Sequence, residues 1–135
     1  MKKTLFTLAL LCGVLFYSCD KKNNCTDFKT GTYLVATDTS FVNTSTIYKT
    51  DDSQLQISPK GDTLYAKVHW LNDCSYKLFF DKAKMDLTPF QINVNTRGGI
   101  LVEFGIPEGD VMPYVSVLKG ETKTETFKGY LKKVN

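Results

Sequence analysis

Apolar and polar residues alternate with a period of two over most of the chain after residue 25, which is typical of half-buried β-strands. In 63–70, one face carries Leu64, Ala66, Val68 and Trp70. The same alternation occurs in 54–58, 75–80, 90–95 and 100–106, with Phe90, Ile92 and Val94, and then Ile100, Val102 and Phe104, expected to face the same interior as Trp70. Four further segments, 30–37, 45–50, 113–119 and 122–133, are rich in the residues that favour strands.

Short turn sequences separate these segments, for example Arg97-Gly98-Gly99 and Pro107-Glu108-Gly109-Asp110. Residues 81–88 break the alternation and predict a loop or one helical turn, and Pro89 limits any helix there. Short strands joined by short turns favour antiparallel neighbours. The sequence therefore predicts an all-β fold, an antiparallel meander of about 8–9 strands that closes into a small up-and-down barrel or curled sheet. A β-sandwich is the alternative.

The amino terminus has a different pattern. Lys2 and Lys3 precede an uncharged apolar run, 4–17, which ends at Ser18-Cys19. The run is too short to span a bilayer, which takes about 20 apolar residues. A small residue directly before a cysteine favours a lipoprotein signal peptide over 1–18, with lipid attachment at Cys19, over a plain secretory signal. We then expect a lipidated tether over 19–24 and a single domain over 25–135.

Charge and cysteine content are best judged without this signal. Removal of Lys2 and Lys3 leaves the mature chain nearly neutral, so the composition gives no reason to expect nucleic-acid binding. Cys12 would leave with the signal and Cys19 would take the lipid. Cys25 and Cys74 would then remain in an oxidising compartment, where we expect them to form a structural disulfide.

Two segments resemble a known group of proteins. Cys25-Thr26-Asp27-Phe28-Lys29-Thr30-Gly31 and Trp70-Leu71-Asn72-Asp73-Cys74-Ser75-Tyr76 are similar to the paired segments of short, uncharacterised bacterial lipoproteins. The resemblance implies an exported domain that has both cysteines and no established activity. Some members of the group carry a DNA topoisomerase IV label, but that enzyme needs an ATP site and a far longer chain.

A second resemblance is to lipocalins, whose first strand carries Gly-x-Trp with a basic residue from the last strand packed on the ring. Gly31-Thr32-Tyr33 is a variant of that pattern, and the resemblance implies Lys128 or Lys132 as the basic partner. The more common interpretation of Gly-x-aromatic is a turn glycine before a core aromatic residue.

Residues with catalytic or metal-binding chemistry are few. His69 is the only histidine and is expected on the outer face of its strand, opposite Trp70. A single histidine without a Cys-x-x-Cys motif does not favour a zinc site, and neither a phosphate-binding loop nor a Gly-x-Ser-x-Gly motif occurs. We therefore expect no catalytic residues, no metal and no cofactor.

Together these features predict a lipid-anchored protein of the cell envelope, at the outer membrane and facing the periplasm or the cell surface. Its expected role is non-catalytic binding of an envelope protein, or structural support. A lipocalin-like carrier of a small apolar ligand is the alternative, and an enzyme is third. A carrier needs an apolar cavity, whereas an interaction module needs an exposed apolar patch.

Overall fold

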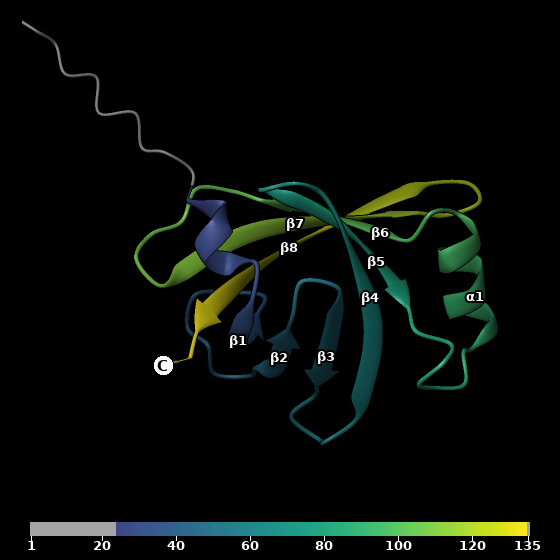
Figure 1. Ribbon diagram of the computed structural model, residues 1–135, viewed down its shortest axis with the longest axis horizontal. Helices are drawn as coiled ribbons and strands as arrows, with labels where there is room; N and C mark the ends of the chain where they lie inside the picture. The colour runs from purple at the N-terminus through teal and green to yellow at the C-terminus, as the bar shows by residue number, and fades with distance from the viewer. Residues whose placement is uncertain (1–23, 135) are drawn as a thin grey trace, which may run out of the picture.

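The computed structural model describes residues 24–134, which form a closed barrel of eight antiparallel strands in sequential order (Figure 1). A short 3₁₀ helix precedes the barrel, and one α-helix lies between the fifth and sixth strands. The elements are η1 (Cys25–Phe28), β1 (Gly31–Ala36), β2 (Ser45–Lys49), β3 (Ser53–Ile57), β4 (Thr63–Asn72), β5 (Ser75–Phe80), α1 (Pro89–Thr96), β6 (Ile100–Phe104), β7 (Val111–Lys119) and β8 (Thr124–Lys133). The prediction of an all-β, up-and-down barrel is confirmed.

Pairing of the first strand with the last closes the barrel. Tyr33 of β1 lies opposite Lys133 of β8, and Ala36 lies opposite Tyr130. Closure removes the unpaired strand edges that would otherwise invite association with other chains. The longest strand pairing joins β7 and β8 in a hairpin that extends beyond the rest of the sheet toward α1 (Figure 1).

The predicted interior face is confirmed for two strands, β4 and β6. Ala66, Val68, Val102 and Phe104 are buried, and Trp70 and Ile100 are partly buried against the same core. The core is completed by residues from other elements: Cys25, Phe28, Tyr33, Ile47, Tyr76, Met112 and Leu131. Tyr33 and Met112 are fully buried, so large side chains occupy the middle of the barrel.

The strand expected over 90–95 is wrong. This segment belongs to α1, and Phe90 and Ile92 are 60% and 52% exposed, whereas Val94 is buried. The helix begins at Pro89, the position where a fixed φ and a missing N–H favour a helix. Pro89 was expected to stop a helix that started in 81–88. No helix forms there, and α1 instead starts at the proline itself.

Two ends of the barrel can be distinguished. One end holds η1, the β2–β3, β4–β5 and β6–β7 connections, and the end of β8 (Figure 1). The other end holds α1 and the β7–β8 turn, which are linked by an Arg97–Glu121 ion pair of 3.2 Å. A disulfide between Cys25 and Cys74, with Cα atoms 5.1 Å apart, fastens η1 to the β4–β5 turn and confirms the expected bridge.

Candidate functional site

A groove between α1 and the outer face of β4 and β5 is the candidate binding site. Its helical wall starts at Thr88, whose hydroxyl accepts a hydrogen bond from Gln91 N while the Gln91 side chain accepts one from Thr88 N. This reciprocal capping box satisfies two backbone donors that a helix amino terminus otherwise leaves free. It stabilises a helix of only eight residues.

Asn95 holds the helix against the barrel. Its side chain accepts a hydrogen bond from Phe80 N at 2.8 Å and donates one to Phe80 O at 2.9 Å. The Asn95 amide therefore satisfies both backbone groups of Phe80, the last residue of β5. After the helix, Gly99 has a φ of +79°, and a Cβ there would lie 2.4 Å from Leu78 O, so the chain needs glycine to return to the sheet.

The groove has a volume of about 480 Å³ and combines apolar and basic side chains. Phe79, Phe80, Leu87 and Ile92 supply apolar surface, while Lys67, His69 and Lys82 supply basic groups. No carboxylate lines the groove itself, but Asp52 and Asp81 line the adjoining hollow, which shares Lys67 and His69 with the groove. Asp81, which follows β5, is 6% exposed and accepts a hydrogen bond from Ala83 N at 3.0 Å. The groove is therefore an apolar surface with a basic side.

Helix α1 also presents apolar surface outward. Ile92, 52% exposed, borders both the groove and a second, open hollow that Pro89, Asn93, Thr96 and Arg97 complete. Phe90, 60% exposed, lies roughly 200° away around the helix and lines neither of them. An exposed apolar side chain that continues the apolar lining of a groove enlarges the surface available to a partner. Asn95 and the Arg97–Glu121 ion pair fix this surface to the sheet, so it is formed before any partner binds.

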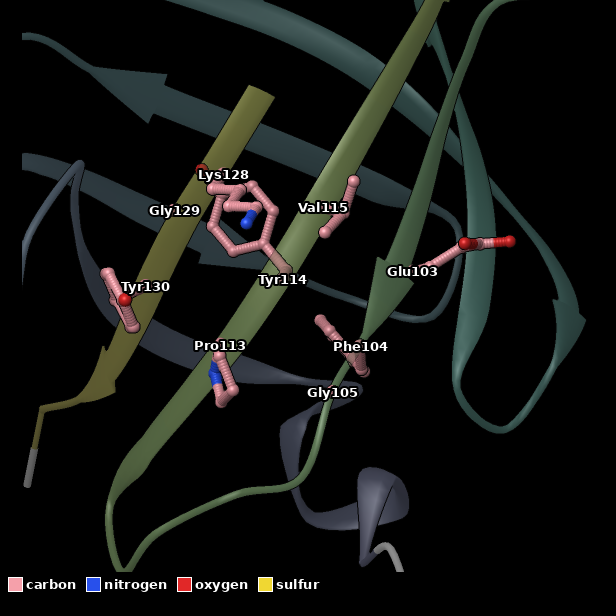
Figure 2. Close-up of a pocket in the computed structure, with 9 residues that line it drawn as sticks. All are labelled: Glu103, Phe104, Gly105, Pro113, Tyr114, Val115, Lys128, Gly129 and Tyr130. Atoms are coloured by element: carbon pink, nitrogen blue, oxygen red, sulfur yellow. The ribbon is translucent and has the colours of Figure 1, made fainter. Parts of the chain in front are cut away.

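A smaller pocket of about 230 Å³ crosses the outer face of β6, β7 and β8 (Figure 2). Glu103, Val115 and Lys128 lie in neighbouring register positions across the three strands, and Pro113 lies opposite Tyr130. Gly129 lets the Tyr114 ring cover its strand, because a Cβ at Gly129 would lie 2.5 Å from that ring. Glu103 and Lys128 are the charged residues of this pocket, so its lining has no net charge, unlike the basic lining of the groove.

Inside the barrel lies a lysine that the sequence analysis missed. Lys49 is 3% exposed, and its Nζ has no hydrogen-bond partner. Four aromatic rings surround this nitrogen at 4.8–5.5 Å from their centroids, those of Tyr33, Trp70, Tyr76 and Phe104. Burial lowers the pKa of Lys49 to about 7 and raises the pKa of Tyr33 to about 12.

The basic partner of Tyr33 is therefore Lys49 of β2, and neither Lys128 nor Lys132 takes that position. Lys128 lines the outer pocket, and Lys132 Nζ lies 5.6 Å from the Phe41 ring. One feature of the sequence could have identified Lys49. It lies two residues after Ile47 on the same strand, which places both side chains on the inner face.

The remaining expected residues fall as follows. His69 is exposed on the outer face, with its ring 5.0 Å from Phe79. Cys19 and the proposed signal lie outside the described residues. Within residues 24–134, no group of three His, Cys, Asp or Glu side chains could hold a metal ion, and no helix is long and apolar enough to cross a membrane.

Comparison of the chain with protein-family models, curated proteins and solved structures gives no match.

Proposed function

We propose that this protein is a lipid-anchored, non-catalytic binding protein of the cell envelope, which holds an acidic, apolar polypeptide segment in the groove beside α1. The observation that carries the proposal is the exposed Ile92 of α1 beside a groove lined by Lys67, His69 and Lys82. Apolar side chains of a partner would bury Ile92 and Phe79. Carboxylates on the same segment would pair with the lysines, which steers association and sets specificity.

The position of the groove fits an anchored protein. A lipid on Cys19 would lie five residues before Asn24, a reach of at most about 18 Å. That tether would hold the η1 end of the barrel near the membrane. Helix α1 lies toward the opposite end (Figure 1), so the groove would stay open to partners at the outer membrane's periplasmic or external face.

The lipocalin-like alternative is less favourable physically. A small apolar ligand inside the barrel would have to displace Tyr33 or Met112, both fully buried, or lie beside the buried Lys49 amine. Placing apolar surface next to an unpaired amine does not improve that amine's solvation. The groove needs no such rearrangement.

The anchor is tested on the protein purified from membranes of a bacterial host. Mass spectrometry of the mature amino-terminal peptide should show diacylglycerol on Cys19. An unmodified chain that starts at another residue would contradict the anchor and would leave the groove proposal to its own test.

The groove is tested with a short peptide in which Leu and Phe alternate with Glu, against a matched peptide with Lys at each Glu position. We expect the acidic peptide to shift the amide resonances of 67–69, 79–82 and 89–96 in nuclear magnetic resonance spectra. Ile92→Glu should weaken binding at least ~tenfold, because it places a charge in the apolar contact. Ile106→Glu is the matched control, since Ile106 is similarly exposed, 54% against 52%, but lies in the β6–β7 connection. Equal binding of the two peptides, or an equal loss in both variants, would overturn the proposal.

A further inference from the structure

The interior of the barrel beneath η1 contains polar groups that neither the fold nor the groove uses. Lys49 and Gln54 lie opposite each other in the β2–β3 pair, next to the turn that joins these strands. Lys49 is 3% exposed and Gln54 5%. Lys49 Nζ, Gln54 Oε1 and Trp70 Nε1 are all buried and all lack a hydrogen-bond partner. Buried polar atoms are almost always paired, so three together indicate a site for a bound species.

The chemistry of the three groups selects an anion. Lys49 carries three donor hydrogens and the Trp70 indole carries one, and neither group can accept. The amide of Gln54 adds two donors when it turns its NH₂ group inward. A ligand that satisfies Lys49 and Trp70 together must therefore be an acceptor.

The charges around Lys49 support the same choice. The ion pairs among the described residues are Lys29–Asp73, Arg97–Glu121 and Lys123–Glu125, so Lys49 has no carboxylate partner there. Its titratable neighbours are Tyr33 on β1 and Tyr76 on β5, and burial raises the pKa of both phenols, which keeps them neutral. An unpaired buried ammonium costs several kcal/mol, and cation–π contacts return only part of it.

Two lysines pack on aromatic rings at the η1 end of the barrel, near the site. Lys29 Nζ lies 4.8 Å from the Trp70 ring centroid, and Lys133 Nζ lies 4.7 Å from that of Phe28 in η1. The acidic side chains at this end are Asp27 in η1, Asp51 and Asp52 in the β2–β3 connection, Asp73 in the β4–β5 turn, and Glu108 and Asp110 in the β6–β7 connection. Asp73 is paired with Lys29 at 3.0 Å. The preference for an anion therefore rests on the buried donors of Lys49 and Trp70, and not on the surface charge of this end.

We propose that the barrel binds a small monovalent anion, a halide or a compact carboxylate such as formate, between the Lys49 ammonium and the indole N–H of Trp70. The anion lies at the edge of the indole, because the ring faces are negative and already face Lys49. The aromatic walls restrict the site to small ions. The site is separate from the α1 groove, so the two proposals fail independently.

Trp70 is the only tryptophan in the chain, so intrinsic fluorescence reports on this site alone. The test is titration of the purified full-length protein with sodium iodide at constant ionic strength. A bound iodide beside the indole should quench the emission along a saturable curve, whereas collisions from solvent quench it linearly. Chloride and formate should compete for the saturable component, and sulfate should not.

Two variants separate the site from general surface charge. Lys49→Met should lower the iodide affinity of the saturable component by ~tenfold or more, because it removes a charge-assisted hydrogen bond to the anion. Lys133→Met removes one charge from the same end and should leave that component unchanged. The wild-type curve alone decides the matter if Lys49→Met fails to fold. A linear curve, competition by sulfate equal to that by chloride, or an equal effect of the two variants would overturn the proposal.

Discussion

Lys49 owes its position to the register of three strands. It lies opposite Gly31 on β1 and opposite Gln54 on β3. Gly31 has a φ of +130° and offers no side chain beside the lysine, so the space next to it is filled by the Tyr33 ring. Tyr33 in turn donates a hydrogen bond to Thr30 O at 2.6 Å, which fixes the ring under Lys49. The lysine is therefore enclosed by backbone geometry as much as by aromatic side chains.

The first prediction concerns the pH dependence of stability. The pKa of Lys49 is about 7 in the folded protein against an ordinary 10.5, so the unfolded chain binds more protons between these values. The free energy of unfolding should therefore rise as the pH increases from 7 toward 10, and the cost of charging Lys49 should be largest below pH 7. Lys49→Met should stabilise the protein by roughly 3–5 kcal/mol near pH 6, and this gain should shrink toward pH 10.

Urea unfolding of both proteins in a gluconate buffer, at several pH values from 6 to about 9.5, measures this difference. The range stops there because Tyr33, Tyr76 and Tyr114 have raised pKa values, so ionisation of the unfolded chain lowers stability at higher pH. The difference between the two proteins isolates Lys49 from other groups. A difference that does not vary with pH would show that Lys49 keeps its charge throughout.

At the scale of the element, α1 shows where alternation alone misleads. Phe90, Ile92 and Val94 repeat every second residue, which indicates a strand, but Phe90 and Ile92 face solvent and Val94 faces the core. A helix of eight residues has about two turns, which is too short for a helical period of 3.6 to be distinguished from a strand period of two. The local signals that do identify it are the Thr88–Gln91 capping box and Pro89 at the first helical position.

The second prediction is that the hydrogen bonds of Asn95 to Phe80 hold α1 against β5. Asn95→Ala should destabilise the protein by ~2 kcal/mol, because it leaves both Phe80 N and Phe80 O without their side-chain partner. Hydrogen exchange at the Phe80 amide should become faster. Urea unfolding and exchange measured by nuclear magnetic resonance test the two effects.

Asn93→Ala is the control on the same helix. Asn93 is exposed, and its side chain accepts one hydrogen bond from Arg97 Nε at 2.6 Å. Its removal should change stability by less than about 0.5 kcal/mol, as surface substitutions usually do. Equal effects of the two substitutions would mean that Val94 packing, and not Asn95, holds the helix.

At the scale of the molecule, eight strands and their sequential order were predictable, whereas the ninth expected strand is α1 and the interior cluster was not predictable. Alternation placed Ala66, Val68, Val102 and Phe104 correctly, because each strand carries its own pattern. The rings around Lys49 come from β1, β4, β5 and β6, so their meeting depends on how the sheet curls and closes. No local pattern contains that information. The groove was missed for the same reason, since it needs α1 to lie against β4 and β5.

The last prediction concerns the Cys25–Cys74 bridge, which joins η1 to the barrel across a separation of 49 residues. Replacement of both cysteines by serine should lower the free energy of unfolding by ~4 kcal/mol on the chain-entropy model. Phe28 packs on Tyr33 and Phe104 at ring distances of 6.0 and 6.5 Å, so a looser η1 should expose the aromatic cluster around Lys49. Trp70 emission should shift to longer wavelength, and linear quenching by iodide should increase. Unchanged emission in the double variant would show that packing of Phe28 alone keeps η1 closed over the barrel.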